Sequence, residues 1–201
     1  MQKVFLYLYP IKEYTKMFEN DNSLAVLNKC IQKRYREKGY QVVFALYPDK
    51  NLYGIILQPN DKIIYTDIKF TESSGIDKNG KKKENFIPKY PSEKYLLEQL
   101  GKVDYLVVGG YHAQDCVRRV CEYALDCGIN SIIDLDMTDF FFHLYKNTDY
   151  FKIEEYSLIR YKELIIGKMN MYGDEFAEKI FNRNYFSPAY GFNREESKKM
   201  K

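Results

Sequence analysis

The chain has 201 residues, which is enough for one α/β domain with a substantial core and too few for two domains of that size. Lys and Arg number 31 against 28 Asp and Glu, a net charge of +3, so charge gives no warrant for a nucleic-acid or membrane-surface partner. No stretch approaches the ~20 apolar residues of a membrane span.

The N-terminus has only a short apolar run before Pro10, and it lacks the hydrophobic region and cleavage site of a signal peptide. The four cysteines show neither metal-ligand nor disulfide-framework spacing, which fits reduced thiols in a cytoplasm. They are Cys30, Cys116, Cys121 and Cys127. We therefore expect a cytoplasmic protein with a single domain over residues 1–201.

The first part of the chain reads as β-α-β. Residues 4–9 form an apolar run that Pro10 closes, and residues 41–46 form a second one. Between them, Asn22 or Ser23 caps a helix that ends at Gly39. Two further extended runs, 52–57 and 62–69, flank Pro59 as a hairpin or an irregular excursion.

Residues 71–84 are polar and include the basic triplet 81–83, which indicates a solvated loop rather than a phosphate site. After this loop the pattern predicts a strand at 86–88, a helix at 92–100, a strand at 105–108, a helix beginning near Cys116, and a strand at 131–135. Helices are expected at 140–145, 154–166 and 174–181, followed by a polar tail over 182–201.

Strands that alternate with helices predict a three-layer α/β/α fold with a mainly parallel sheet, Rossmann-like in general form. Sites in such sheets lie at the carboxyl ends of strands. Cys116 follows the strand at 105–108 and Gly109-Gly110, just where the next helix begins. A helix N-terminus stabilises a thiolate, so this position predicts a lowered thiol pKa and a nucleophilic role, whereas a plain packing role is the alternative.

The stretches VVGG-YHAQDCV, RRVCEYALDCG and INSIIDLDMTD carry a resemblance to a known family. With Phe86-Ile87-Pro88-Lys89 upstream, they resemble the isochorismatase-like cysteine hydrolases, which include nicotinamidases. The resemblance covers roughly residues 3–145 and is densest in its last third. The matching positions are Cys116-Val117, Ala124, Gly128, Asp136 and Thr138.

In that family a Cys, a Lys and an Asp act together, and the aspartate takes the thiol proton before the thiolate attacks a carbonyl carbon. The resemblance implies Cys116 as the nucleophile, Lys89 as the supporting lysine, and the backbone amides of His112 and Cys116 as the oxyanion hole. It also implies a cis peptide bond at Tyr111-His112.

The family's aspartate belongs near the end of the first strand, where this chain has Tyr7 or Tyr9. A phenol with a pKa near 10 is a poor proton acceptor at neutral pH. Another group could replace the base, the fold could persist without hydrolysis, or an acid could reach the site from elsewhere. The candidate replacements are His112, Asp115 and Asp49.

The sequence thus predicts an isochorismatase-like cysteine hydrolase that acts on a small amide or related substrate through Cys116, with an atypical or missing acid partner. The alternative is a catalytically inactive homologue that binds a ligand or serves in assembly. We expect no cofactor, and no metal because only His112 and His143 could supply imidazole ligands. The resemblance implies a homo-oligomer, and we expect a small-molecule partner rather than nucleic acid or a membrane.

Overall fold

A computed structural model gives the fold, and it describes residues 1–15, 23–76, 80, 81, 83–138, 186 and 187. Within these residues, parallel strands form one sheet in the order β3-β2-β1-β4-β5-β6. The strands are β1 (Lys3–Leu8), β2 (Gln41–Leu46), β3 (Lys62–Tyr65), β4 (Tyr105–Gly110), β5 (Asn130–Thr138) and β6 (Phe186–Ser187).

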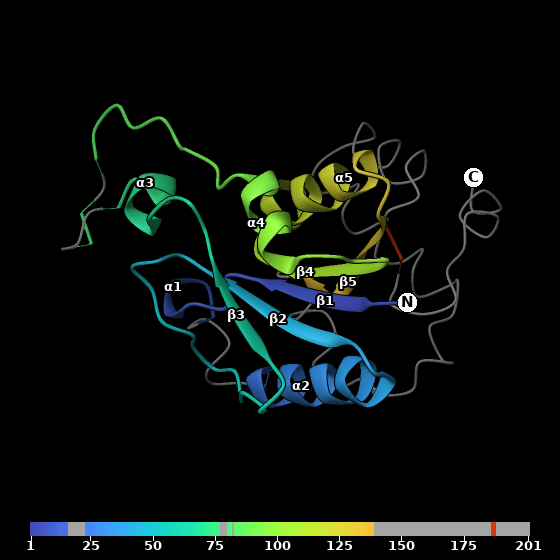
Figure 1. Ribbon diagram of the computed structural model, residues 1–201. Coiled ribbons are helices and arrows are strands. Elements are labelled where there is room, and N and C mark those ends of the chain that lie inside the picture. Colours follow the sequence, from blue (N-terminus) through green and yellow to red (C-terminus); the bar gives the residue numbers. More distant parts are fainter. Residues whose placement is uncertain (16–22, 77–79, 82, 139–185, 188–201) are drawn as a thin grey trace, which may run out of the picture.

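Helices cover both faces of this sheet (Figure 1). The helix α2 (Ser23–Cys30) continues through turns at Ile31–Tyr35 and Arg36–Lys38 and covers one face. The helices α4 (Glu93–Leu100) and α5 (Arg118–Asp126) cover the other. The described chain also has two short α-helices, α1 (Lys12–Thr15) and α3 (Phe70–Ser74). The predicted three-layer α/β/α class is confirmed.

The strand β1 is buried along nearly its whole length because helices lie on both of its faces. Its side chains alternate between the two cores. Leu6 and Leu8 pack under α4 and α5, whereas Phe5 and Tyr7 pack against α2. The stacked rings of Phe5 and Tyr35, whose centroids lie 3.6 Å apart, fasten α2 to the sheet.

The order of the strands creates a topological switch point. From β1 the chain builds outward through β2 and β3, and it then returns to the opposite side of β1 to form β4. The connections after β1 and β4 therefore leave the sheet in opposite directions. Such a point, outside the carboxyl ends of two neighbouring strands, is where open α/β sheets bind ligands.

Several predicted elements agree closely with the structure. The strand at 41–46 has the predicted bounds, and the α2 segment ends at Gly39, which adopts the left-handed conformation with a φ of 74°. The predicted helix at 92–100 is α4, whose N-cap Ser92 accepts a hydrogen bond from the Tyr95 amide. The predicted strand at 131–135 extends at both ends to form β5.

Of the two alternatives for 52–57 and 62–69, the hairpin is wrong, because residues 52–57 form no strand and β3 runs parallel to β2, and the irregular excursion is confirmed. The strand predicted at 86–88 is also wrong, because these residues form none. The apolar side chains of Leu52 and Ile55 instead lie partly buried against the edges of the two cores. The predicted loop at 71–84 begins inside α3. The helices expected at 140–145, 154–166 and 174–181, and most of the tail over 182–201, lie outside the described residues.

A buried ion pair joins the α2 segment to β5. The guanidinium of Arg34 lies 3.4 Å from the carboxylate of Asp134, and both side chains are fully buried. The hydroxyl of Tyr35 also donates to Asp134, and the Met137 amide donates to it at 3.4 Å. These donors offset much of the cost of removing the carboxylate from water.

We expect Asp134→Ala to lower the free energy of unfolding by about 3–5 kcal/mol, because it removes the carboxylate from a fully buried ion pair. Urea denaturation checks this value. Asp104→Ala is the control, since Asp104 pairs with the chain's amino group at the surface and its loss should cost far less. Equal losses in the two variants would contradict the importance of the buried pair.

Candidate functional site at the carboxyl ends of β1 and β4

Cys116 lies where β4 gives way to α5. After β4 the Tyr111–His112 peptide bond is cis, and a wide turn over Ala113–Val117 leads into the helix. In this turn the Val117 amide donates to the carbonyl of His112 at 3.2 Å. The cis bond and the position of Cys116 just before the first turn of α5 confirm the expectations from the sequence.

The side-chain alternation of β1 breaks at Tyr9. Leu8 belongs to the core under α5, so strict alternation would send Tyr9 with Tyr7 to the α2 side. However, Tyr9 has a left-handed backbone with a φ of 57°, which is rare for an aromatic residue, and its ring joins the α5 side. Tyr9, rather than Tyr7, therefore shares a core with Cys116.

Two more phenols surround this pair. The ring of Tyr47, which directly follows β2, lies 4.6 Å from the ring of Tyr9. The Tyr47 hydroxyl donates to Oγ of Ser73 at 3.1 Å. Tyr14 of α1 acts electrostatically on both Tyr47 and Cys116. The thiol is thus enclosed mainly by groups that are neutral at pH 7.

These surroundings favour the protonated thiol. Burial, and after it the nearby Asp115 carboxylate, raises the pKa of Cys116 to about 12, and only 8% of the residue is exposed. Burial also holds the pKa of the Tyr9 phenol well above its ordinary value. The expectation of a lowered thiol pKa is wrong for this structure, because desolvation of the sulfur outweighs the helix N-terminus.

Asp115 is the acid nearest in sequence to the thiol, and it is half-buried. Burial raises the pKa of its carboxyl group, and Arg119 and His112 oppose that shift. The Tyr90 hydroxyl forms a hydrogen bond with Asp115, and the Arg119 guanidinium lies 4.5 Å from the Tyr90 ring centroid. Arg119 also pairs with Glu93 at 2.5 Å. These residues form a charged rim beside the neutral interior.

His112, predicted as a replacement base, does lie at this site. Its ring packs edge-on against Tyr14, with 4.6 Å between the centroids. Its carbonyl accepts hydrogen bonds from the amides of Asp115 and Val117. The residue therefore helps to shape the turn that carries Cys116.

Lys89 does not sit at the end of a strand, because residues 86–88 form none. Its side chain is 69% exposed, and its ammonium lies 3.9 Å from the carboxylate of Glu72. It is not among the groups that act most strongly on the pKa of Cys116. The structure therefore does not bring together the lysine and cysteine that the resemblance pairs.

Asp49, the third candidate base, has a structural use. Its carboxylate accepts a hydrogen bond from the Phe70 amide at 2.7 Å, at the first residue of α3.

Two residues in β5 match the family pattern. Thr138 is buried, and its hydroxyl donates to the carbonyl of Asp134 at 2.6 Å. The side chain of Asp136 lies outside the description. Sequence reasoning missed Tyr14, Tyr47, Tyr90 and Arg119, although the position of Tyr47 directly after β2 was a usable signal.

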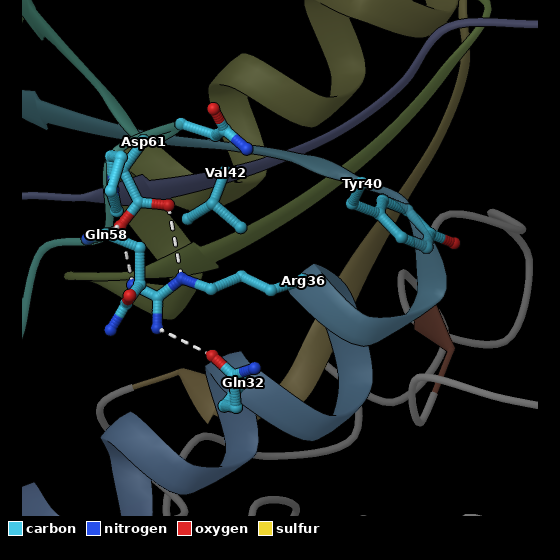
Figure 2. Close-up of a pocket in the computed structure, with 8 residues that line it drawn as sticks. Gln32, Arg36, Tyr40, Val42, Gln58 and Asp61 are labelled. Carbon is cyan, nitrogen blue, oxygen red and sulfur yellow. Dashed lines mark hydrogen bonds and ion pairs between the residues drawn. The ribbon is translucent and has the colours of Figure 1, made fainter.

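A hollow of about 260 Å³ lies elsewhere, near the amino ends of β2 and β3 (Figure 2). The guanidinium of Arg36 forms two hydrogen bonds with the Asp61 carboxylate there, at 2.6 and 3.1 Å, and a third with the Ile56 carbonyl at 2.9 Å. These contacts fasten the end of the α2 segment to the loop before β3. The charges of the hollow are thus already paired with each other.

Among the described residues, no group of three or more His, Cys, Asp or Glu side chains is arranged to hold a metal ion. In the same part of the chain, no helix combines the length and the apolar character that crossing a membrane requires.

No family model and no curated protein matches the chain. Among solved structures, it is similar to a protein of Leishmania major titled "putative Mar1 ribonuclease", with 19% sequence identity and a TM-score of 0.45. The match covers 68% of this chain and 64% of the other, so the chain spans less than two thirds of that protein's length. An identity this low defines neither family nor activity, and the fold class rests on the parallel sheet itself.

Gly110 lets the backbone of β4 lie close to that of β1 beside the site, because it has no side chain. Its φ is 107°, and an added Cβ would lie 2.2 Å from the Leu8 carbonyl oxygen. We expect Gly110→Ala to lower the free energy of unfolding by at least about 2 kcal/mol, because the clash adds to the ~1–2 kcal/mol of a left-handed backbone. Gly128→Ala is the matched control, since Gly128 also has a positive φ but open space around it. Equal losses in urea denaturation would contradict the clash.

The raised thiol pKa predicts slow alkylation of Cys116. Below its pKa the thiolate fraction rises tenfold per pH unit, so the rate with iodoacetamide should rise about tenfold per unit from pH 7 to 10 without a plateau. Peptide mass spectrometry separates Cys116 from the exposed Cys127. In urea-unfolded protein the same cysteine should level off above about pH 8.5. A plateau near that pH in the folded protein would show an unshifted thiol.

Proposed function

We propose that this chain is a divergent isochorismatase-like protein that binds a small molecule beside Cys116 without hydrolysing it through that thiol. One observation carries the proposal: Cys116 and Tyr9 are buried in the same core, where burial raises the pKa of both groups, and isochorismatase-like hydrolases have an aspartate at the position of Tyr9. The cis bond at Tyr111–His112 and the placement of Cys116 support the resemblance.

The binding half of the proposal rests on the switch point between β1 and β4. Tyr9 follows β1 and the turn with Cys116 follows β4, so both lie at the edge of the sheet where α/β proteins take their ligands. The half-buried residues there, Tyr14, His112 and Asp115, offer a ligand an aromatic wall and polar groups.

The non-hydrolytic half rests on proton transfer. Attack by Cys116 requires a group that accepts the thiol proton, and a phenol that is itself protonated cannot. Lys89 forms a surface ion pair with Glu72. The Asp49 carboxylate accepts a hydrogen bond from the first amide of α3. Burial raises the pKa of the Cys116 thiol to about 12, so the protonated thiol predominates at pH 7.

A second candidate function is hydrolysis of a small amide with Asp115 as the base. The observation that favours it is the raised pKa of the half-buried Asp115 carboxyl group, since a raised pKa makes a stronger base. Asp115 would take the thiol proton, the sulfur would attack the carbonyl carbon, and the leaving amine would receive that proton. Water would then hydrolyse the thioester.

Ammonia release from a panel of small amides separates the two candidates. Under the main proposal the wild-type protein releases no ammonia above the uncatalysed rate, while small molecules found by thermal shift slow the alkylation of Cys116 and still bind Cys116→Ala. Cys127→Ala, at an exposed cysteine, is the control and should behave as the wild type.

Ammonia release that Cys116→Ala abolishes and Asp115→Asn lowers by about 10²-fold or more would establish the hydrolase instead. If no small molecule slows the alkylation of Cys116, the binding proposal is wrong.

Self-association, which the resemblance implies, also belongs to the proposal. Sedimentation of the purified chain as a single species with the mass of one copy would refute it.

A further inference from the structure

We infer that the hydroxyl of Tyr9 donates a hydrogen bond to the sulfur of Cys116, which makes Tyr9 the positioning residue of this site. The inference deepens the proposed function and rests on the same site. It gives a role to Tyr9, at the position where the resembled family has an aspartate. The inference can be tested with no ligand present.

The backbone supplies the first argument. Without its left-handed conformation, Tyr9 would continue the alternation of β1 and its ring would point toward α2. The Tyr9 amide nevertheless keeps its hydrogen bond to the Ala45 carbonyl at 2.9 Å, so the pairing with β2 extends one residue past the strand. The chain thus turns one side chain to the other face while the sheet register is kept. Strained backbone of this kind persists where the surroundings over-determine it.

Burial supplies the second argument. Tyr9 is 1% exposed, and among the described residues its hydroxyl has no hydrogen-bond partner of good geometry. After burial, the thiol of Cys116 is the group that acts most strongly on the pKa of this hydroxyl, and Tyr9 acts in turn on the pKa of the thiol. A buried hydroxyl that lacks a partner is costly, so the donor has reason to point at the sulfur.

The neighbouring phenols are engaged elsewhere. The Tyr47 hydroxyl donates to Ser73, and Tyr14 interacts with Tyr47. The ring of Tyr47 lies against the ring of Tyr9 at 4.6 Å and limits its movement. Tyr9 is therefore the phenol that is both held in place and available to the sulfur.

A phenol in this position orients the thiol but does not deprotonate it. Its hydrogen can bond to the sulfur lone pairs, and the bond strengthens when the sulfur carries negative charge. Removing the hydroxyl should therefore disfavour the thiolate, whereas removing a phenol that does not touch the sulfur should not.

Alkylation of Cys116 by iodoacetamide across pH 7 to 10, followed by peptide mass spectrometry, tests the inference in full-length Tyr9→Phe. We expect a rate about tenfold lower at each pH, since a hydrogen bond to a charged group accounts for a factor of this order. Tyr47→Phe is the matched control. It removes one oxygen from a ring of the same cluster, and its rates should stay within about twofold of the wild type.

An unchanged profile in Tyr9→Phe, a faster reaction, or an equal slowing in both variants would overturn the inference. Circular dichroism and thermal unfolding are recorded for each variant. A Tyr9→Phe protein that does not fold would also overturn it, because the hydroxyl would then be a structural group. Ligand binding is not measured in this experiment, so failure of the proposed function and failure of the inference are separate results.

Discussion

The structure depends on the burial of β1 between β2 and β4. Residues from Val4 to Leu8 are at most 1% exposed, and each is paired with a residue on both neighbouring strands. The strand can shift in neither direction without moving both cores, because a slip of one residue would exchange the side chains of the two faces. The position of Tyr9 is therefore set by the sheet before any property of the site is considered. The same pairing brings the end of β4, and with it Cys116, to the end of β1.

The two cores of the molecule differ in the way they bury polar groups. On the α2 side, the opposite charges of Arg34 and Asp134 are both fully buried, and donors from Tyr35 and Met137 surround the carboxylate. On the α5 side, no charged residue of the described chain lies with Cys116 in the buried core. Desolvation acts on both sides, but only on the first does an ion pair offset it. The low ionisation of Cys116 is thus a consequence of the groups around it rather than of burial alone.

The sequence predicted those parts of the fold that depend on local patterns. Continuous apolar runs located β1, β2 and β4, and Ser92 and Gly39 located helix ends, because caps act within a few residues. The absence of a strand at 86–88 was not predictable in this way, since a short apolar run looks the same whether it joins a sheet or packs over it. At the site, the place of Cys116 followed from the order of elements. The turn of Tyr9 toward the α5 side did not, because alternation predicts the opposite face.

The Tyr9 phenol limits the direction in which a proton can move at this site. A carboxylate would accept the thiol proton, whereas the Tyr9 phenol holds its own proton and has a pKa well above the ordinary value. Charge at the site is confined to the rim, where Asp115 is hydrogen-bonded to Tyr90 and Arg119 is paired with Glu93. A proton leaving Cys116 would have to cross from the neutral interior to that rim. The separation of a neutral interior from a charged rim therefore disfavours loss of the Cys116 proton, although the thiol lies just before the first turn of α5.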